Sequence, residues 1–208
     1  MLRILSILFV AVLLLAACGK KAEEKTEVSY LDDEKIFTAA SNKLVAKFGG
    51  ELKGELISAM SEGGAIAAIE VCHEEAPKIA AANSGEYWSI RRVSDRSRNP
   101  DNLASTHELD VMASLQDTIA PSWSHEWADT ETKPLFRFYQ TIRIAPVCTK
   151  CHGTEDAIDA DVKAMLAELY PDDKAVGYQP GDLRGMFVVE VQWPEGRAFA
   201  DGLVGDTL

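Results

Sequence analysis

Residues 135–152, LFRFYQTIRIAPVCTKCH, join a strand-like pattern to a compact group of cysteine and histidine. Apolar and polar side chains alternate over 135–144, which is typical of a half-buried β-strand. One face carries Phe136, Phe138, Ile142 and Ile144, and the other carries Arg137, Tyr139, Thr141 and Arg143. The pattern recurs in residues 186–193, MFVVEVQW, with Phe187, Val189, Val191 and Trp193 on one face, and residues 87–94 predict another strand. The sequence therefore predicts an antiparallel sheet.

Helical periodicity dominates the part of the chain that precedes these strands. Apolar residues recur at helical spacing from Ile36 to Met60, which predicts one long N-terminal helix, bent at Gly49-Gly50. Further helices are predicted over 63–82, 105–119 and 159–170, the second of these starting with a capping serine. Helices followed by antiparallel strands indicate an α+β fold.

The N-terminus has the layout of an export signal. Residues 1–17 combine Arg3 with an apolar stretch that is too short to span a membrane, and small residues precede Cys18. This is the pattern of a lipoprotein signal peptide, with an ordinary signal peptide as the alternative. We expect a lipid on Cys18, a flexible tether over 18–29, and one domain over 30–208. Gly19, rather than aspartate, favours a periplasmic location at the outer membrane over the inner one.

The acidic composition restricts the partners. The chain has a net charge of −12, which argues against nucleic acid and against charge-driven binding to anionic lipid. Membrane attachment is therefore expected through the lipid on Cys18 alone.

The CxxCH motif is the strongest functional pattern in the chain. Cys148 and Cys151 can form thioethers to the two vinyl groups of one haem, with His152 as the proximal iron ligand. A structural zinc site needs four ligands and usually a second cysteine pair, which is absent among the four cysteines. A redox dithiol is a further alternative, and the sequence favours one covalent haem c.

The other axial ligand has several candidates. Cys72 is the thiol left unexplained, and it lies on an apolar helical stripe: Ala65, Ile69, Cys72, Ala76 and Ile79. The residues alone leave open that Cys72 is a buried, inert thiol. His73 lies at the edge of the stripe, His107 near a helix start, and His125 between aromatic residues, while Met112 fits a helix core. Pro77 requires a kink or break just after Cys72.

Basic and aromatic residues suggest how a haem is held. Arg91, Arg92, Arg96 and Arg98 form a basic cluster in an acidic chain and could bind haem propionates. Local ion pairs with Asp95 and Asp101 are an equal alternative. Trp123, Trp127 and Tyr139 could pack on the porphyrin, although such residues more often belong to the core.

Four blocks together resemble the haem-c-binding PAS-like domain family, whose members are free-standing or form the sensory part of bacterial histidine kinases. They are AIEVCHEEAP (68–77), RRVSDRSRNPDN (91–102), PVCTKCHG (146–153) and GYQPGDLRGMFVVEV (177–191). The resemblance implies a PAS-like antiparallel sheet flanked by helices, with one covalent haem. It also implies that Cys72 is the axial ligand opposite His152.

The export signal, the CxxCH motif and the family resemblance together predict the function of the chain. We expect an exported, non-enzymatic c-type haem protein that senses redox state or a diatomic gas, with the thiolate ligand lowering the reduction potential. The alternative is an electron-transfer cytochrome with a periplasmic redox partner protein. A haem peroxidase would need a positioned acid or base, and only His125 or His107 could supply it.

Overall fold

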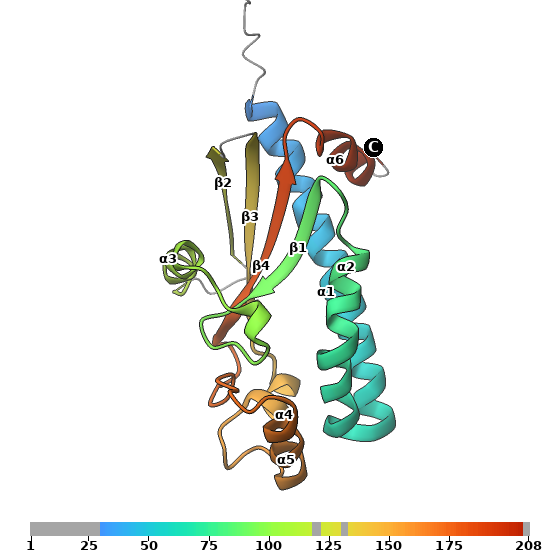
Figure 1. Ribbon diagram of the computed structural model, residues 1–208, viewed down its shortest axis with the longest axis vertical. Helices are drawn as coiled ribbons and strands as arrows, with labels where there is room; N and C mark the ends of the chain where they lie inside the picture. Colours follow the sequence, from blue (N-terminus) through green and yellow to red (C-terminus); the bar gives the residue numbers. More distant parts are fainter. Residues whose placement is uncertain (1–29, 118–121, 130–132, 206–208) are drawn as a thin grey trace, which may run out of the picture. The chain divides into compact units, whose positions relative to one another are not determined.

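A computed structural model describes residues 30–117, 122–129 and 133–205 (Figure 1). The predicted signal peptide, Cys18 and the tether over 18–29 lie outside the described residues, as does the end of the helix predicted over 105–119. Within the described ranges, no helix has both the length and the apolar character needed to cross a bilayer.

Four antiparallel strands form one sheet, in the order β1-β4-β3-β2. The strands are β1 (Trp88–Val93), β2 (Trp123–Asp129), β3 (Pro134–Arg143) and β4 (Leu183–Gln192). The three strands predicted over 87–94, 135–144 and 186–193 are confirmed, and with them the α+β class. Strand β2 was not predicted, although Trp123, His125 and Trp127 alternate with smaller or charged residues along it.

One face of the sheet packs against the N-terminal part of α1 (Tyr30–Glu70) and against α6 (Arg197–Gly205). Phe37, Leu44 and Phe48 of α1 are buried against Phe136 and Val189 of the central strands. The apolar faces that the alternation predicted for β3 and β4 therefore form the main core. Helix α6 was not predicted from the sequence.

The opposite face is covered by α3 (Thr106–Ser114). A capping box starts this helix: Ser105 accepts from the backbone N–H of Glu108, and the Glu108 carboxylate accepts from that of Ser105. Met112 packs on Tyr139 of β3, which confirms Met112 as a core residue. The second face of β3 is thus partly buried under a helix.

A helical hairpin lies beside the sheet: the chain runs along α1, reverses, and returns through α2 (Ala76–Ala82) (Figure 1). The reversal lies at Gly64, whose φ of 67° is a left-handed conformation that glycine adopts without steric cost. The helix continues through Gly49-Gly50, so the bend predicted there is wrong. The intrinsic cost of two glycines is offset by the packing of neighbouring Phe48 in the core.

The returning helix contains a π-helical turn, η1 (Val71–Glu75), that carries Cys72. The backbone N–H of Ala76 donates to Val71, five residues back, and Pro77 follows in the first turn of α2. The irregularity predicted next to Pro77 is confirmed. The wider turn lets proline continue the helix, and such turns often occur at functional sites.

The segment between β3 and β4 forms a small lobe at one end of the sheet. It contains η3 (Pro146–Cys148), α4 (Thr149–His152) and α5 (Ala160–Leu169). Ile158, Val162 and Leu166 of this lobe pack against Ile69, which lies one turn before Cys72. This apolar cluster joins the helical hairpin to the lobe that carries the CxxCH motif.

Candidate cofactor site

His152 is held as a neutral imidazole with one nitrogen left available. Its Nδ1 lies 2.7 Å from the backbone oxygen of Ala175, so Nδ1–H donates there and Nε2 carries the lone pair. Burial lowers the pKa of His152 well below its usual value, and the nearby Arg98 and Arg184 guanidiniums lower it further. A neutral, oriented imidazole of this kind is what a metal ion requires of a histidine ligand.

The two cysteines of the motif lie on one tight turn beside His152. Cys148 ends η3, and Cys151 lies in the short α4, where it packs against the apolar cluster of the lobe. Gly153 ends α4, and a Cβ there would approach the backbone oxygen of Thr149 to 2.4 Å. The glycine after the motif is therefore required by close packing of the turn.

Cys72 reaches the same site from the helical hairpin. It is a free, half-buried thiol, and burial raises its pKa, while the positive charges of Arg92 and Arg98 lower it. Cys148 is close enough to interact with it electrostatically. The fold thus brings the leftover thiol to the CxxCH motif across 76 positions of sequence.

A partly open cleft of about 460 Å³, which includes solvent at its mouth, lies between the hairpin and β1. Cys72, Phe48 and Ala76 line it from the helices, and Arg92 lines it from β1. Desolvation lowers the pKa of Arg92, which lies over the Phe48 ring at 5.9 Å. No carboxylate of the described residues lies within ion-pair distance of Arg92. A desolvated cation without a counter-ion favours an anionic group in the cleft.

Arg98 has a different role, because its charge is already compensated. Its Nε donates to the Asp173 carboxylate at 2.9 Å, and the two side chains are only 8% and 11% exposed. Its Nη2 donates to the backbone oxygen of Cys151 at 2.6 Å. Arg98 therefore fixes the backbone of the CxxCH turn.

The other two predicted arginines also have partners. The Arg91 guanidinium pairs with Glu108 of α3. Arg96 donates to the backbone oxygen of Lys174 and stacks at 4.0 Å over the Tyr178 ring. Asp95 and Asp101, the partners expected for local ion pairs, form none with these arginines in the described part of the chain.

Sequence reasoning missed Arg184, a second cation at this site that has no described carboxylate within ion-pair distance. Its Nη1 donates to Ser94 Oγ at 2.7 Å and to the backbone oxygen of Arg96, and it affects the pKa of both His152 and Cys72. It is the extra residue of a β-bulge, where Ile142 pairs with Gly185 but Arg143 pairs with Leu183. Simple alternation fails at a bulge, which redirects side chains.

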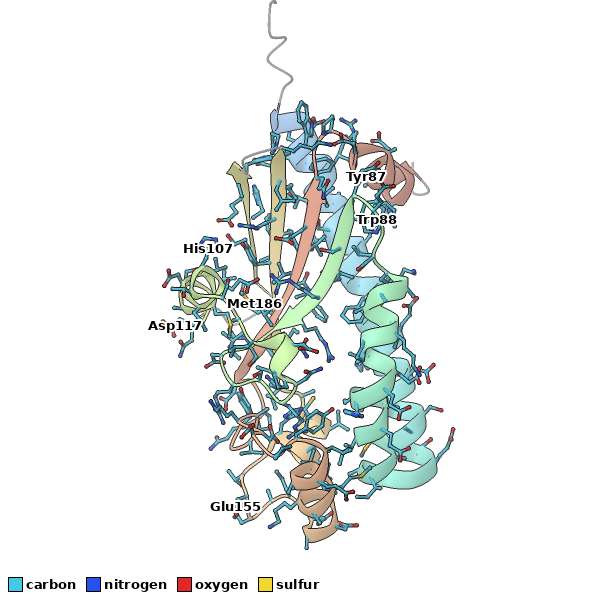
Figure 2. The ribbon with its side chains drawn as sticks, in the orientation of Figure 1. Tyr87, Trp88, His107, Asp117, Glu155 and Met186 are labelled. Carbon is cyan, nitrogen blue, oxygen red and sulfur yellow. The ribbon has the colours of Figure 1, made fainter. Side chains whose placement is uncertain are left out.

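Of the other candidate histidine ligands, His107 and His125 lie away from the site. His125 contacts Glu34, and His107 contacts Glu126 on β2, the edge strand opposite β1. Figure 2 labels His107 on α3, well away from Glu155 of the lobe. Trp127 and Tyr139 pack within the core clusters, and Trp123 stacks on His125. His73 next to Cys72 contacts Tyr170 of the lobe.

The donor set fits an iron porphyrin. The His152 imidazole and the Cys72 thiol could serve as iron ligands, and Cys148 and Cys151 have the spacing needed to form two thioethers. Arg92 and Arg184 could donate hydrogen bonds to the carboxylates of the porphyrin. Among the described residues, no three His, Cys, Asp or Glu side chains gather closely enough to hold a single metal ion.

Comparison with known proteins gives the family. The crystal structure of the cyanobacterial heme-protein Tll0287 superimposes with a TM-score of 0.52 at 23% identity, covering 72% of this chain and 92% of that one. A comparison with curated protein sequences gave no match. The model of the Tll0287-like family matches residues 19–192, a range that includes all four blocks that carry the resemblance to haem-c-binding PAS-like domains. The chain belongs to the Tll0287-like family.

Proposed function

We propose that this chain is an exported c-type haem protein that senses redox state or a diatomic gas. Cys148 and Cys151 attach one haem, and His152 and Cys72 are its axial ligands. The structurally similar cyanobacterial protein Tll0287 is a heme-protein, which supports haem as the cofactor here. A lipid on Cys18 would hold the protein at the periplasmic face of the outer membrane.

One observation carries the proposal: the Nδ1 of His152 lies 2.7 Å from the backbone oxygen of Ala175, and the free Cys72 thiol from another element interacts electrostatically with Cys148 and Cys151 of the same motif. This hydrogen bond places the ring proton on Nδ1 and the lone pair on Nε2, as in histidines that ligate metals. Arg92 and Arg184 add two positive charges that have no carboxylate of the described residues within ion-pair distance. Two such cations match the two propionates of one haem.

Bound haem would supply one-electron redox chemistry and an iron centre that binds diatomic gases. The residues around it would set its coordination. Arg92 stabilises the Cys72 thiolate over the thiol, because its charge lowers the pKa that burial raises. Arg98 holds the backbone of Cys151, and the Ala175 oxygen holds the His152 ring. A thiolate ligand favours ferric iron and therefore a low reduction potential.

The ligation is tested by comparing Cys72→Ala with His73→Ala in protein matured in a host that attaches haem c. The neighbouring histidine is a matched control, since it lies on the same turn. We expect Cys72→Ala to lose the low-spin ferric signal in the optical and EPR spectra, and His73→Ala to retain mainly low-spin iron. An unchanged signal in Cys72→Ala would remove this residue from the coordination sphere.

Electron transfer to a periplasmic partner is the second candidate, favoured by the net charge of −12, which suits a basic redox partner. A redox titration with CO added to the reduced protein separates the two: sensing predicts a low potential and CO binding, and a carrier predicts a high potential without it. We propose no enzymatic activity, because the two histidines that could act as acid or base, His107 and His125, contact Glu126 and Glu34 near β2, at the sheet edge opposite β1.

A further inference from the structure

The two candidate axial ligands come from separate parts of the fold. Cys72 belongs to the helical hairpin, and His152 belongs to the lobe between β3 and β4. Their mutual placement therefore depends on what ties the hairpin to the lobe. A short segment after α5, residues Tyr170–Ala175, contacts both sides, and we call it the ligand strap.

The end of the ligand strap nearest His152 is firmly fixed. The Ala175 oxygen accepts from His152 Nδ1, and the Ala175 backbone N–H donates to Asp173 Oδ1 at 2.8 Å. The other oxygen of Asp173 accepts from Arg98, which also donates to Cys151. These bonds make one buried network around the histidine, and its members restrain one another.

The other end of the ligand strap reaches the Cys72 turn. The Tyr170 hydroxyl lies 2.9 Å from His73 Nδ1, and the two rings meet edge to face with centroids 5.2 Å apart. Tyr170 is buried and packs in the same apolar cluster as Ile69. Its backbone oxygen accepts from the Asp173 N–H at 3.0 Å, which links this end to the network around His152.

We infer that the ligand strap positions both axial ligands, and that the hydrogen bond between His73 and Tyr170 holds the Cys72 turn against the lobe. The hydrogen-bonded path runs from His73 through Tyr170, Asp173 and Ala175 to His152. Because His73 directly follows Cys72 on the π-helical turn, the contact of His73 with Tyr170 would control how readily Cys72 is displaced by a gas. His73 and Tyr170 are positioning residues, and the inference rests on the proposed His152/Cys72 ligation.

The test uses the haem-loaded protein and removes single hydrogen-bonding groups. Tyr170→Phe deletes only the hydroxyl, and His73→Ala deletes its partner. Each should accelerate the association of CO with the reduced protein roughly threefold, as expected for the loss of one partly exposed hydrogen bond, and should raise the high-spin share of the ferric spectrum. The double variant should show no more than either single change, because both remove the same bond.

Tyr139→Phe is the matched control, since the Tyr139 hydroxyl donates to Glu126 at 2.7 Å on the far side of the sheet. Its CO rate and spin state should equal those of the wild type. The inference is overturned if Tyr170→Phe behaves as the wild type, if the control shows the same acceleration, or if the two single effects multiply in the double variant. Wild-type protein without haem, or without thiolate ligation, would instead refute the proposed function.

Discussion

The buried ion pair between Arg98 and Asp173 gives the sharpest prediction about stability. The N–O distance is 2.9 Å, and both side chains are about nine-tenths buried. Arg98→Met keeps most of the side-chain volume but leaves the Asp173 carboxylate without its counter-ion. Breaking a buried pair in this way typically costs about 3–5 kcal/mol. We expect the free energy of unfolding to fall by about 3–4 kcal/mol, because bonds to Cys151 and Asp173 are lost together.

Urea denaturation of the haem-loaded protein, followed by circular dichroism, measures this loss. Lys78→Met is the control, since its pair with Glu75 is exposed on a helix, and it should leave the urea midpoint unchanged. Replacing Asp173 by leucine in the Arg98→Met background should restore part of the stability, because no charge then remains unpaired. A loss below about 1 kcal/mol for Arg98→Met would refute the reasoning, since it would equal that of a surface pair.

Three further predictions concern the scaffold. Ser105→Ala should lower the free energy of unfolding by about 1 kcal/mol, because it removes the cap of α3, and should leave the haem spectrum unchanged; urea denaturation and absorption spectra check both. Gly64→Ala should destabilise the fold by about 1–2 kcal/mol because φ is positive there. Gly54→Ala, in open space on the same helix, should stabilise it by about 0.5–1 kcal/mol. The thermal unfolding midpoint should therefore fall in the first variant and rise in the second. Burial and the hydrogen bond to Glu126 raise the pKa of Tyr139 well above its usual 10.0, so the unfolded chain ionises first and stability falls as pH rises above 10. Urea midpoints measured against pH should therefore fall less in Tyr139→Phe.

Local periodicity predicted most of the fold. Alternation located β3 and β4, the residue types of 87–94 located β1, and capping located the start of α3, because each pattern arises from short-range geometry. A helix boundary between Met60 and residue 63 was predicted, close to the reversal at Gly64, but the bend predicted at Gly49-Gly50 is absent, although both glycine pairs have equal intrinsic propensities. Packing of Phe48 against the sheet keeps the helix continuous at the first pair.

The candidate site was harder to assemble from sequence. The CxxCH spacing predicts His152 as a ligand and the family resemblance implies Cys72, but the role of each arginine depends on its tertiary partner. Arg98 finds Asp173, 75 residues away, whereas Arg92 finds no carboxylate among the described residues. Arg184 escaped notice because a β-bulge sets its direction, and no periodic pattern reveals a bulge.

The central claim is that one haem is attached to Cys148 and Cys151 with His152 and Cys72 as axial ligands. Intact-mass measurement of protein matured in the periplasm tests the attachment, and the EPR spectrum of the same ferric sample tests the ligands. We expect a mass increase of one haem and a low-spin signal of thiolate type that Cys72→Ala abolishes. A mass without added haem, or the same low-spin signal in Cys72→Ala, would contradict it.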